Sequence, residues 1–188
     1  MLKFKIAAVL LLSGWLSYAQ AQQPSAGEVT PQTEDRISRE VRHEVLMLPW
    51  YGVFDVIGYQ VNGTKVTLKG SVVRPVTKSD AENAVKRIEG VTSVDNQIEA
   101  LPPSPMDDRS RVALFRAIYG FPSLEKYDLG TIKPIRIIVK SGHVSLEGVV
   151  DNQSDKDTAG IRANSVPGIF EVKNNLQVVP NGDDGKKK

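Results

Sequence analysis

Hydrophobic residues recur every three or four positions just after residue 33, and this spacing predicts an amphipathic helix. Thr33 can cap its first turn, and Pro49 ends it because proline cannot continue a helix. The polar positions between the apolar ones carry mostly charged side chains, which suit a solvent-facing surface. The apolar stripe consists of Ile37, Val41, Val45 and Leu48.

The pattern then changes to alternation, which is typical of strands that are buried on one side. Residues 57–61 and 66–68 alternate in this way, and Asn62-Gly63 between them favours a tight hairpin. A second helix is predicted from near Ser79 to Gly90, and residues 94–100 alternate again as a third strand.

The same order of elements occurs a second time. Val66–Gly70 matches Val144–Gly148, and Gly90–Ile98 matches Gly168–Leu176, with the same offset along the chain for both pairs. A fixed offset of this kind predicts a structural repeat rather than one larger core.

The first helix of the second copy follows a shorter offset. Asp35-Arg36 matches Asp108-Arg109, and the difference between the two offsets means that the second copy carries five extra residues between Pro122 and Ile135. Ser104 is the predicted N-cap of this helix, with Pro105 in its first turn. The helix stripe is predicted as Ser110, Leu114, Ile118 and Phe121, and the second hairpin turn as Ser141-Gly142.

Each copy therefore reads helix, strand, strand, helix, strand. The hairpin makes the first two strands antiparallel, and the helical crossover makes the last two parallel. The fold class is α+β: two tandem small αββαβ domains, each a mixed three-stranded sheet with two helices on one face.

Proline, polar and terminal segments define the domain limits. Three prolines between the copies form a linker too short to let them separate. The predicted segments are a signal peptide (1–21), a flexible leader (22–32), the first domain (33–101), a Pro-rich linker (102–105), the second domain (106–180) and a disordered basic tail (181–188).

The first 21 residues have the layout of a secretory signal peptide. Lys3 and Lys5 precede an apolar run, and Ala19-Gln20-Ala21 supplies a cleavage site. The run is short for a bilayer span, although an uncleaved anchor is the alternative. We expect a periplasmic protein that is soluble after cleavage.

Composition excludes several classes of function. The 24 basic and 22 acidic residues give a net charge of +2, which does not favour nucleic acid as a partner. The chain has no cysteine, so it has no disulfide, thiolate metal site or lipid anchor attached to cysteine. With two histidines and no phosphate-binding loop, we expect no catalysis, no metal and no cofactor.

The repeated motif resembles the BON domain family. The resemblance rests on the pattern Val66-x-Leu68-x-Gly70-x-Val72, followed by Gly90-Val91-x-x-Val94-x-Asn96-x-Ile98. The second copy repeats this pattern from Val144 to Leu176. These are core and turn residues, so the resemblance is specific for fold and weak for chemistry.

The resemblance implies a non-catalytic envelope protein. A signal peptide followed by two such domains is similar to periplasmic tandem-BON proteins that are induced by osmotic stress. BON domains are linked to phospholipid surfaces and to protection of the envelope. A chaperone-like role toward unfolded or outer-membrane proteins is the alternative that the family implies.

Aromatic and basic residues near the first helix of the second copy are the candidate site. They combine a basic charge for lipid phosphate with apolar side chains for shallow insertion. The alternatives for them are packing in the core or between the copies, and a solvated helix face. The predicted lipid-binding residues are Arg116, Phe121, Leu124, Lys126 and Tyr127, with Trp50 and Tyr51 as a secondary contact.

Overall fold

The computed structural model of the chain describes residues 31–179. The predicted signal peptide, the predicted leader up to residue 30 and the predicted basic tail lie outside these residues. Pro31 and Gln32, which the composition places in the leader, already belong to the first helix.

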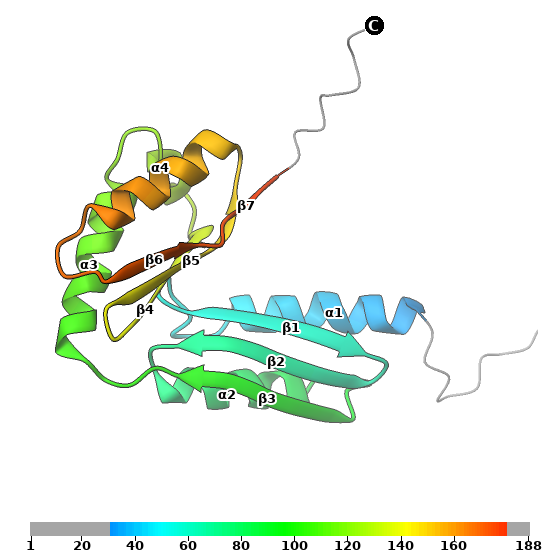
Figure 1. Ribbon diagram of the computed structural model, residues 1–188. Coiled ribbons are helices and arrows are strands. Elements are labelled where there is room, and N and C mark those ends of the chain that lie inside the picture. The colour runs from blue at the N-terminus through cyan, green and yellow to red at the C-terminus, as the bar shows by residue number, and fades with distance from the viewer. Residues whose placement is uncertain (1–30, 180–188) are drawn as a thin grey trace, which may run out of the picture.

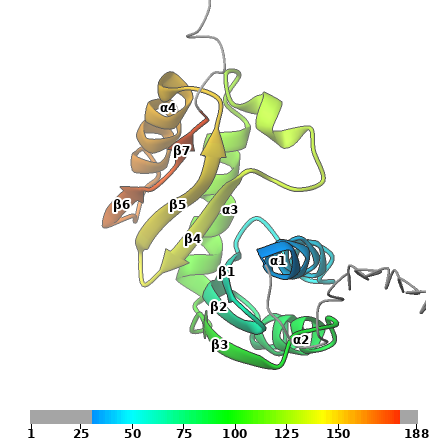
Figure 2. The ribbon, with the colours of Figure 1, turned by 90° about the vertical axis from the view of Figure 1, so that its right-hand side faces the viewer.

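The first unit is a three-stranded sheet with two helices on one side (Figures 1 and 2). Its strand order is β1-β2-β3, with β1 antiparallel to β2 and β3 parallel to it, as the sequence predicts. The elements are α1 (Pro31–Leu46), β1 (Val56–Asn62), β2 (Lys65–Val72), α2 (Pro75–Lys86) and β3 (Ser93–Ala100).

The second unit repeats this arrangement. The elements are α3 (Pro105–Tyr119), the 3-10 helix η1 (Glu125–Asp128), β4 (Ile135–Lys140), β5 (His143–Val150), α4 (Gln153–Asn164), β6 (Glu171–Asn174) and β7 (Gln177–Val178). Strands β6 and β7 both pair in parallel with β5. The predicted single last strand is therefore interrupted after Asn174, and the α+β tandem fold is confirmed.

Each unit has its own hydrophobic core, which is what two small repeats require. The predicted stripe of α1 is buried from Ile37 to Leu48, and it packs on Val66 and Leu68 of β2. The second core contains Leu114 and Ile118 of α3. The prediction that Ser110 begins the buried stripe of α3 was wrong. Ser110 is only half-buried, and its helix neighbours Asp107 and Arg111 are the buried residues there.

Helix starts differ from the predictions in three places. Thr33 lies inside the first turn of α1 rather than before it. α2 begins at Pro75, ahead of the predicted Ser79, because proline fits the first helical position. Likewise α4 begins at Gln153, ahead of Asp157, the repeat equivalent of the predicted start at Ser79. Asn152 precedes the helix, and its side chain accepts a hydrogen bond from the Asp155 N–H at 2.8 Å.

Two glycines of the repeated motif lie inside strands. Gly70 in β2 has φ +131° and Gly148 in β5 has φ +116°, a backbone conformation that other residues rarely adopt. A Cβ added at Gly148 would lie 1.9 Å from the carbonyl oxygen of Pro134, which precedes β4. Glycine is required there because the start of the neighbouring strand passes directly over it.

The outer edge of β4 is covered by groups from elsewhere in the chain. The Tyr119 hydroxyl donates to the Ile135 carbonyl at 2.7 Å and accepts from the Ile135 N–H at 3.1 Å. The Ile137 N–H donates to the Val53 carbonyl at 2.9 Å, and the Arg111 guanidinium donates to the Val139 carbonyl at 2.7 Å. A free strand edge invites pairing with another chain, and here it is occupied.

The cover over β4 also joins the two units. Residues 49–55 of the first unit reach the second, where the Arg136 guanidinium donates to the Gly52 carbonyl at 2.6 Å. Phe54 meets Phe115 of α3 edge-on, with ring centroids 6.5 Å apart. Glu99 and Lys140 form an ion pair of 2.5 Å across the same junction. The short linker predicted such packing.

Candidate functional site

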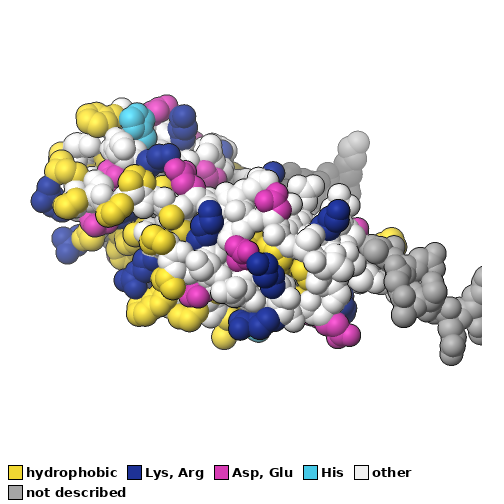
Figure 3. All heavy atoms as spheres, turned by 90° about the horizontal axis from the view of Figure 1, so that it is seen from below, with side chains coloured by type: hydrophobic (Ala, Val, Ile, Leu, Met, Phe, Trp, Pro, Cys, Tyr) yellow, Lys and Arg dark blue, Asp and Glu magenta, His cyan; other side chains and the backbone are white. Residues whose placement is uncertain are grey.

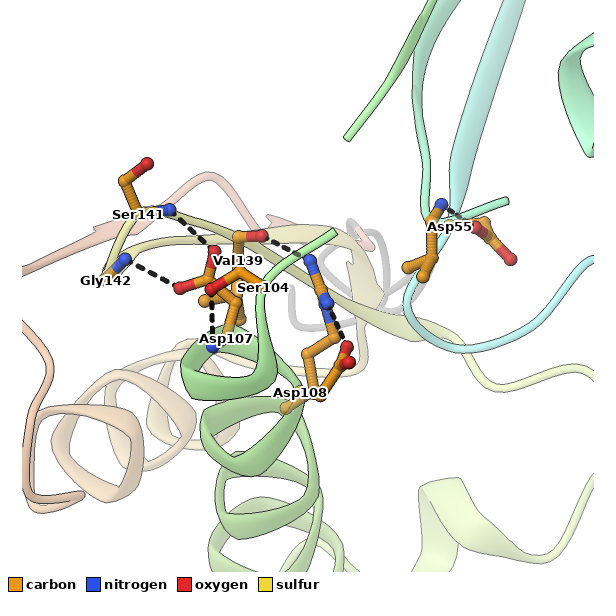
Figure 4. A network of polar contacts seen from close by, with 9 residues as sticks. Asp55, Ser104, Asp107, Asp108, Val139, Ser141 and Gly142 are labelled. Atoms are coloured by element: carbon orange, nitrogen blue, oxygen red, sulfur yellow. Dashed lines mark hydrogen bonds and ion pairs between the residues drawn. The ribbon is translucent and has the colours of Figure 1, made fainter. Parts of the chain in front are cut away.

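Helix α3 is fixed at its first turn by two polar residues. Ser104 is the N-cap, as predicted, and its hydroxyl accepts from the Asp107 N–H at 3.2 Å. Buried Asp107 then bonds the β4–β5 turn: its carboxylate accepts from the N–H groups of Ser141 at 2.8 Å and Gly142 at 2.9 Å (Figure 4). The start of α3 and this turn are therefore held together.

The first unit has the same connection. Glu34, which matches Asp107 at the offset of the two leading helices, accepts a hydrogen bond of 2.5 Å from the N–H of Gly63 in the β1–β2 turn. An acid in the first turn of the leading helix thus holds the hairpin turn in both copies. This contact is structural and does not by itself point to a ligand.

The outward side of α3 combines apolar and basic side chains. Met106 is 61% exposed and Val112 is 44% exposed, on the side opposite the buried Leu114 and Ile118. Within residues 31–179, the Arg116 guanidinium has no hydrogen-bond or ion-pair partner, and Arg109 contacts the Met106 sulfur. A shallow groove of about 410 Å³ on this side is lined by Asp108, Arg109, Val112, Ala113 and Arg116.

The structure places two of the predicted insertion residues in the core. Leu124 is fully buried and Tyr127 is 8% exposed, both packed with Leu114 and Ile118. Shallow insertion of Leu124 and Tyr127 into a bilayer is therefore incompatible with their burial, and this part of the prediction is corrected. Phe121 is half-buried against the same core, and the Arg162 guanidinium lies 5.0 Å from its ring centroid.

Lys126 is already engaged by two carboxylates. Its ammonium lies 2.7 Å from both Asp151 and Asp155, and these contacts raise the pKa of Lys126. Burial opposes ionisation of Asp155, but the hydrogen bonds from Lys126, Tyr127 and Asn152 outweigh it and hold the pKa of this carboxyl below its usual value. The predicted role of Lys126 in holding phosphate is thus less suited to the structure than that of Arg116.

The Tyr127 hydroxyl connects this cluster to the backbone, since it donates to Asp155 at 2.6 Å and accepts from the Asp151 N–H at 2.8 Å. In the first unit the Asp55 carboxylate accepts the corresponding backbone hydrogen bond, from the Val73 N–H at 2.7 Å. Val73 and Asp151 are equivalent positions of the repeat. The insertion in the second copy therefore supplies a tyrosine where the first copy uses a carboxylate.

A pH-dependent contribution to stability follows from this buried phenol. Burial, followed by the neighbouring carboxylates, raises the pKa of Tyr127 to about 12. An unfolded tyrosine ionises near its ordinary pKa of about 10, so the contribution is complete below about pH 10 and is lost as the pH rises through about 12. We expect the difference in unfolding free energy between the wild type and Tyr127→Phe to shrink across this range in urea titrations.

Tyr59→Phe is the matched control, because Tyr59 is half-buried in β1. It reports what the loss of a half-buried tyrosine hydroxyl does over the same pH range, and the change for Tyr127→Phe should exceed it. A difference for Tyr127→Phe that does not shrink with pH would contradict the raised pKa of Tyr127.

Of the two residues predicted as a secondary contact, Trp50 is exposed and Tyr51 packs against neighbouring residues. Trp50 is 55% exposed, with the Arg74 guanidinium 4.4 Å from its ring centroid. Tyr51 is half-buried: its ring lies beneath Arg136 at 4.5 Å, and its hydroxyl accepts from the Ile57 N–H at 3.3 Å. The alternative of packing between the copies therefore holds for Tyr51, whereas Trp50 remains accessible.

Sequence reasoning missed the exposed apolar residues that the structure brings to the surface of the second unit. Met106 and Val112 on α3, and Phe170 before β6, are among them. Figure 3 shows hydrophobic side chains interspersed with Lys and Arg at the end of the molecule that the second unit occupies. The helical period, extended to the side opposite the core, would have identified the two α3 residues.

Two features are absent from the described residues. Among residues 31–179, no group of three His, Asp or Glu side chains is arranged to hold a metal ion. In the same part of the chain, no helix has the length and apolar character needed to cross a membrane.

The motif and the two repeated sheets agree with a comparison against known protein families. The sequence model of the BON domain matches residues 33–102 and 123–180. The chain belongs to the BON domain family. The second BON match begins after α3, although α3 packs on its sheet as α1 does in the first unit.

One curated relative is named for its induction by osmotic conditions. It is osmotically-inducible protein Y of Escherichia coli strain K12, to which the chain is 29% identical over 118 residues. The match covers 60% of this chain and 56% of the relative, so it spans a little over half the length of that protein. The chain is accordingly similar to an osmotic-stress protein over that region.

Solved structures give weaker likenesses. Two structures of CdsD, a structural protein of the type III secretion system of Chlamydia trachomatis, match at 15% identity. They cover 76% and 78% of this chain and 96% and 94% of their own chains, with TM-scores of 0.27 and 0.28. Scores this low add nothing to the argument about fold or function.

Proposed function

We propose that this BON protein is a non-catalytic periplasmic protein that binds anionic phospholipid surfaces peripherally and supports the cell envelope under osmotic or other stress. The outward side of α3 carries the proposal. It combines the exposed apolar residues Met106 and Val112 with Arg109 and Arg116.

This composition suits the boundary between lipid headgroups and acyl chains. Basic residues near an anionic leaflet each contribute about 1 kcal/mol, and exposed apolar side chains gain by leaving water. Arg116 is available for such a contact because no described residue neutralises it. The groove of about 410 Å³ beside it is shallow and open, which fits a surface contact better than an enclosed small-molecule site.

Delivery to the envelope is part of the proposal. It rests on the signal-peptide pattern of residues 1–21 and on the likeness to osmotically-inducible protein Y. Trp50, exposed beside Arg74 on the first unit, is kept as a secondary contact with the same kind of surface.

The alternative function, holding unfolded or outer-membrane proteins, finds less support. Binding an extended client at a sheet edge needs unpaired backbone groups. At β4 these groups are bonded to Tyr119, Val53 and Arg111, so this edge does not offer them, although β1, β3 and β6 are also edge strands. We favour the lipid surface because the outward side of α3 combines exposed apolar residues with Arg109 and Arg116.

Sedimentation with vesicles tests the proposal. The processed chain, residues 22–188, contains every described residue and should bind vesicles containing phosphatidylglycerol but not vesicles of phosphatidylcholine alone. Binding should weaken between low and moderate salt, because surface charge is screened over about 10 Å at about 0.1 M salt. Reversing two charges with Arg109→Glu and Arg116→Glu should weaken binding at least about tenfold.

The double variant Arg39→Glu and Arg42→Glu is the matched control, since it makes the same change in net charge on α1. It should bind almost as well as the wild type. Equal loss in both double variants would show that net charge, and not the α3 surface, governs binding. Absence of binding by the wild type to any vesicle would refute the proposed lipid function.

A further inference from the structure

The turn before β6 presents a phenylalanine to solvent. Phe170 is 79% exposed. An exposed aromatic ring of this size is unfavourable in water unless something covers it.

The position of Phe170 is fixed by its neighbours. Its backbone N–H donates to the Gly142 carbonyl at 2.9 Å, and its ring lies against Gly142 and 5.9 Å from the His143 ring, measured between centroids. A Cβ at residue 142 would lie 2.6 Å from the phenylalanine ring. Glycine at this position thus makes room for the exposed ring.

The first copy provides an internal comparison. Thr64 and Thr92 are the repeat equivalents of Gly142 and Phe170, and the Thr92 N–H donates to the Thr64 carbonyl at the same distance of 2.9 Å. There, however, the two hydroxyls bond each other at 2.8 Å. The backbone contact is therefore shared, while only the second copy replaces a polar pair by glycine and an exposed aromatic ring.

Phe170 lies at the same end of the second unit as the start of α3. Both ribbon views place the β4–β5 turn, the start of β6 and the first turn of α3 at this end (Figures 1 and 2). Asp107 ties the turn directly to α3 through Ser141 and Gly142 (Figure 4). Phe170 and the α3 surface are consequently held in one orientation.

Basic side chains accompany the ring. Lys173 on β6 is largely exposed, and its nearest acid, Glu171, is 3.9 Å away. His143 stands beside the ring, and Arg109 extends from the first half of α3. This end of the molecule thus places the cations Arg109 and Lys173, together with the acid Glu171, on the same side as an exposed apolar ring. Cations beside an apolar group complement phosphate headgroups above acyl chains.

We propose that Phe170 is the residue that penetrates the bilayer, and that it orients the second unit with the β4–β5 turn and the start of α3 toward the membrane. The inference rests on the proposed lipid function and adds the anchor and the orientation. The aromatic ring enters the acyl boundary, while Arg109, Lys173 and His143 remain at headgroup depth.

A depth measurement tests this orientation. The chain has no cysteine, so Phe170→Cys and Thr92→Cys each carry one nitroxide label at equivalent places in the two copies. With phosphatidylglycerol vesicles, the label at residue 170 should become protected from a water-soluble nickel relaxant and accessible to oxygen. The label at residue 92 should remain accessible to nickel, and continued nickel access at residue 170 in the bound protein would overturn the inference.

Affinity gives an independent readout. Phe170→Ser should weaken vesicle binding about fivefold to tenfold, and Phe170→Trp should preserve it. Leu129→Ser is the control, because Leu129 is 87% exposed in the loop after η1; it should change binding less than twofold. If Phe170→Ser binds vesicles normally while Arg109→Glu/Arg116→Glu loses binding, Phe170 is not the anchor and the proposed lipid function stands. If the wild type does not bind vesicles, both the anchor and the lipid function are rejected.

Discussion

Gly148→Ala should unfold the second unit while leaving the first folded. The alanine Cβ would lie 1.9 Å from the Pro134 carbonyl oxygen, and the backbone at φ +116° is itself strained for any residue with a side chain. The start of β4 would have to move, and with it Ile135, whose backbone groups are bonded to Tyr119. We expect a loss of about 4 kcal/mol in the unfolding free energy of this unit.

Hydrogen exchange followed by mass spectrometry can read the two units separately. Peptides from β4 and β5 should lose protection in Gly148→Ala, whereas those from β2 should keep it. Gly168→Ala is the matched control: Gly168 has φ +82°, but nothing lies within 4 Å of an added Cβ. It should lose only about 1 kcal/mol, and a similar loss in both variants would show that close approach to Pro134 is unimportant.

Leu124→Ala should destabilise the second unit without acting on lipid directly. Leu124 is fully buried with Leu114 and Ile118, and removing a buried leucine side chain in this way destabilises by about 3 kcal/mol. Urea denaturation should show a lower midpoint. Under conditions where the variant is folded, its vesicle affinity should equal that of the wild type.

Leu129→Ala is the control, because it makes the same substitution at an exposed leucine. Leu129 lies a short way further along the chain and is exposed, so its substitution should change stability by less than about 0.5 kcal/mol. If Leu124→Ala were instead stable and failed to bind vesicles, Leu124 would be a surface residue, and the burial described above would be wrong.

The repeat made most of the fold predictable. Alternation, two hairpin turns and one fixed offset between the copies specify both sheets, because each pattern has one favourable geometry. The insertion between Pro122 and Ile135 has no counterpart in the first copy and no clear period. Its residues Leu124 and Tyr127 therefore could not be assigned to core or surface from sequence.

The candidate surface was predictable only in part. Arg116 was identified as a basic residue near an apolar stretch, and no described residue pairs with it. Lys126 has the same chemical character, but its two partners, Asp151 and Asp155, come from a turn and a helix much further along the chain. Pairing over such separations depends on tertiary packing, which periodicity does not report. Phe170 was detectable by comparing it with Thr92, a contrast that lies in the repeat itself.

The carbonyl of Val53 on the edge of β4 has a consequence for anyone who divides the protein in two. A fragment that begins at the linker would contain all of β4 but would leave the Ile137 N–H and the Phe115 ring without their partners Val53 and Phe54. Such a fragment would expose a strand edge that the whole chain keeps occupied, and edge-to-edge aggregation of the isolated half is the expected outcome. A fusion that appends residues 49–55 to the second half would again cover the edge of β4 and should remain monomeric.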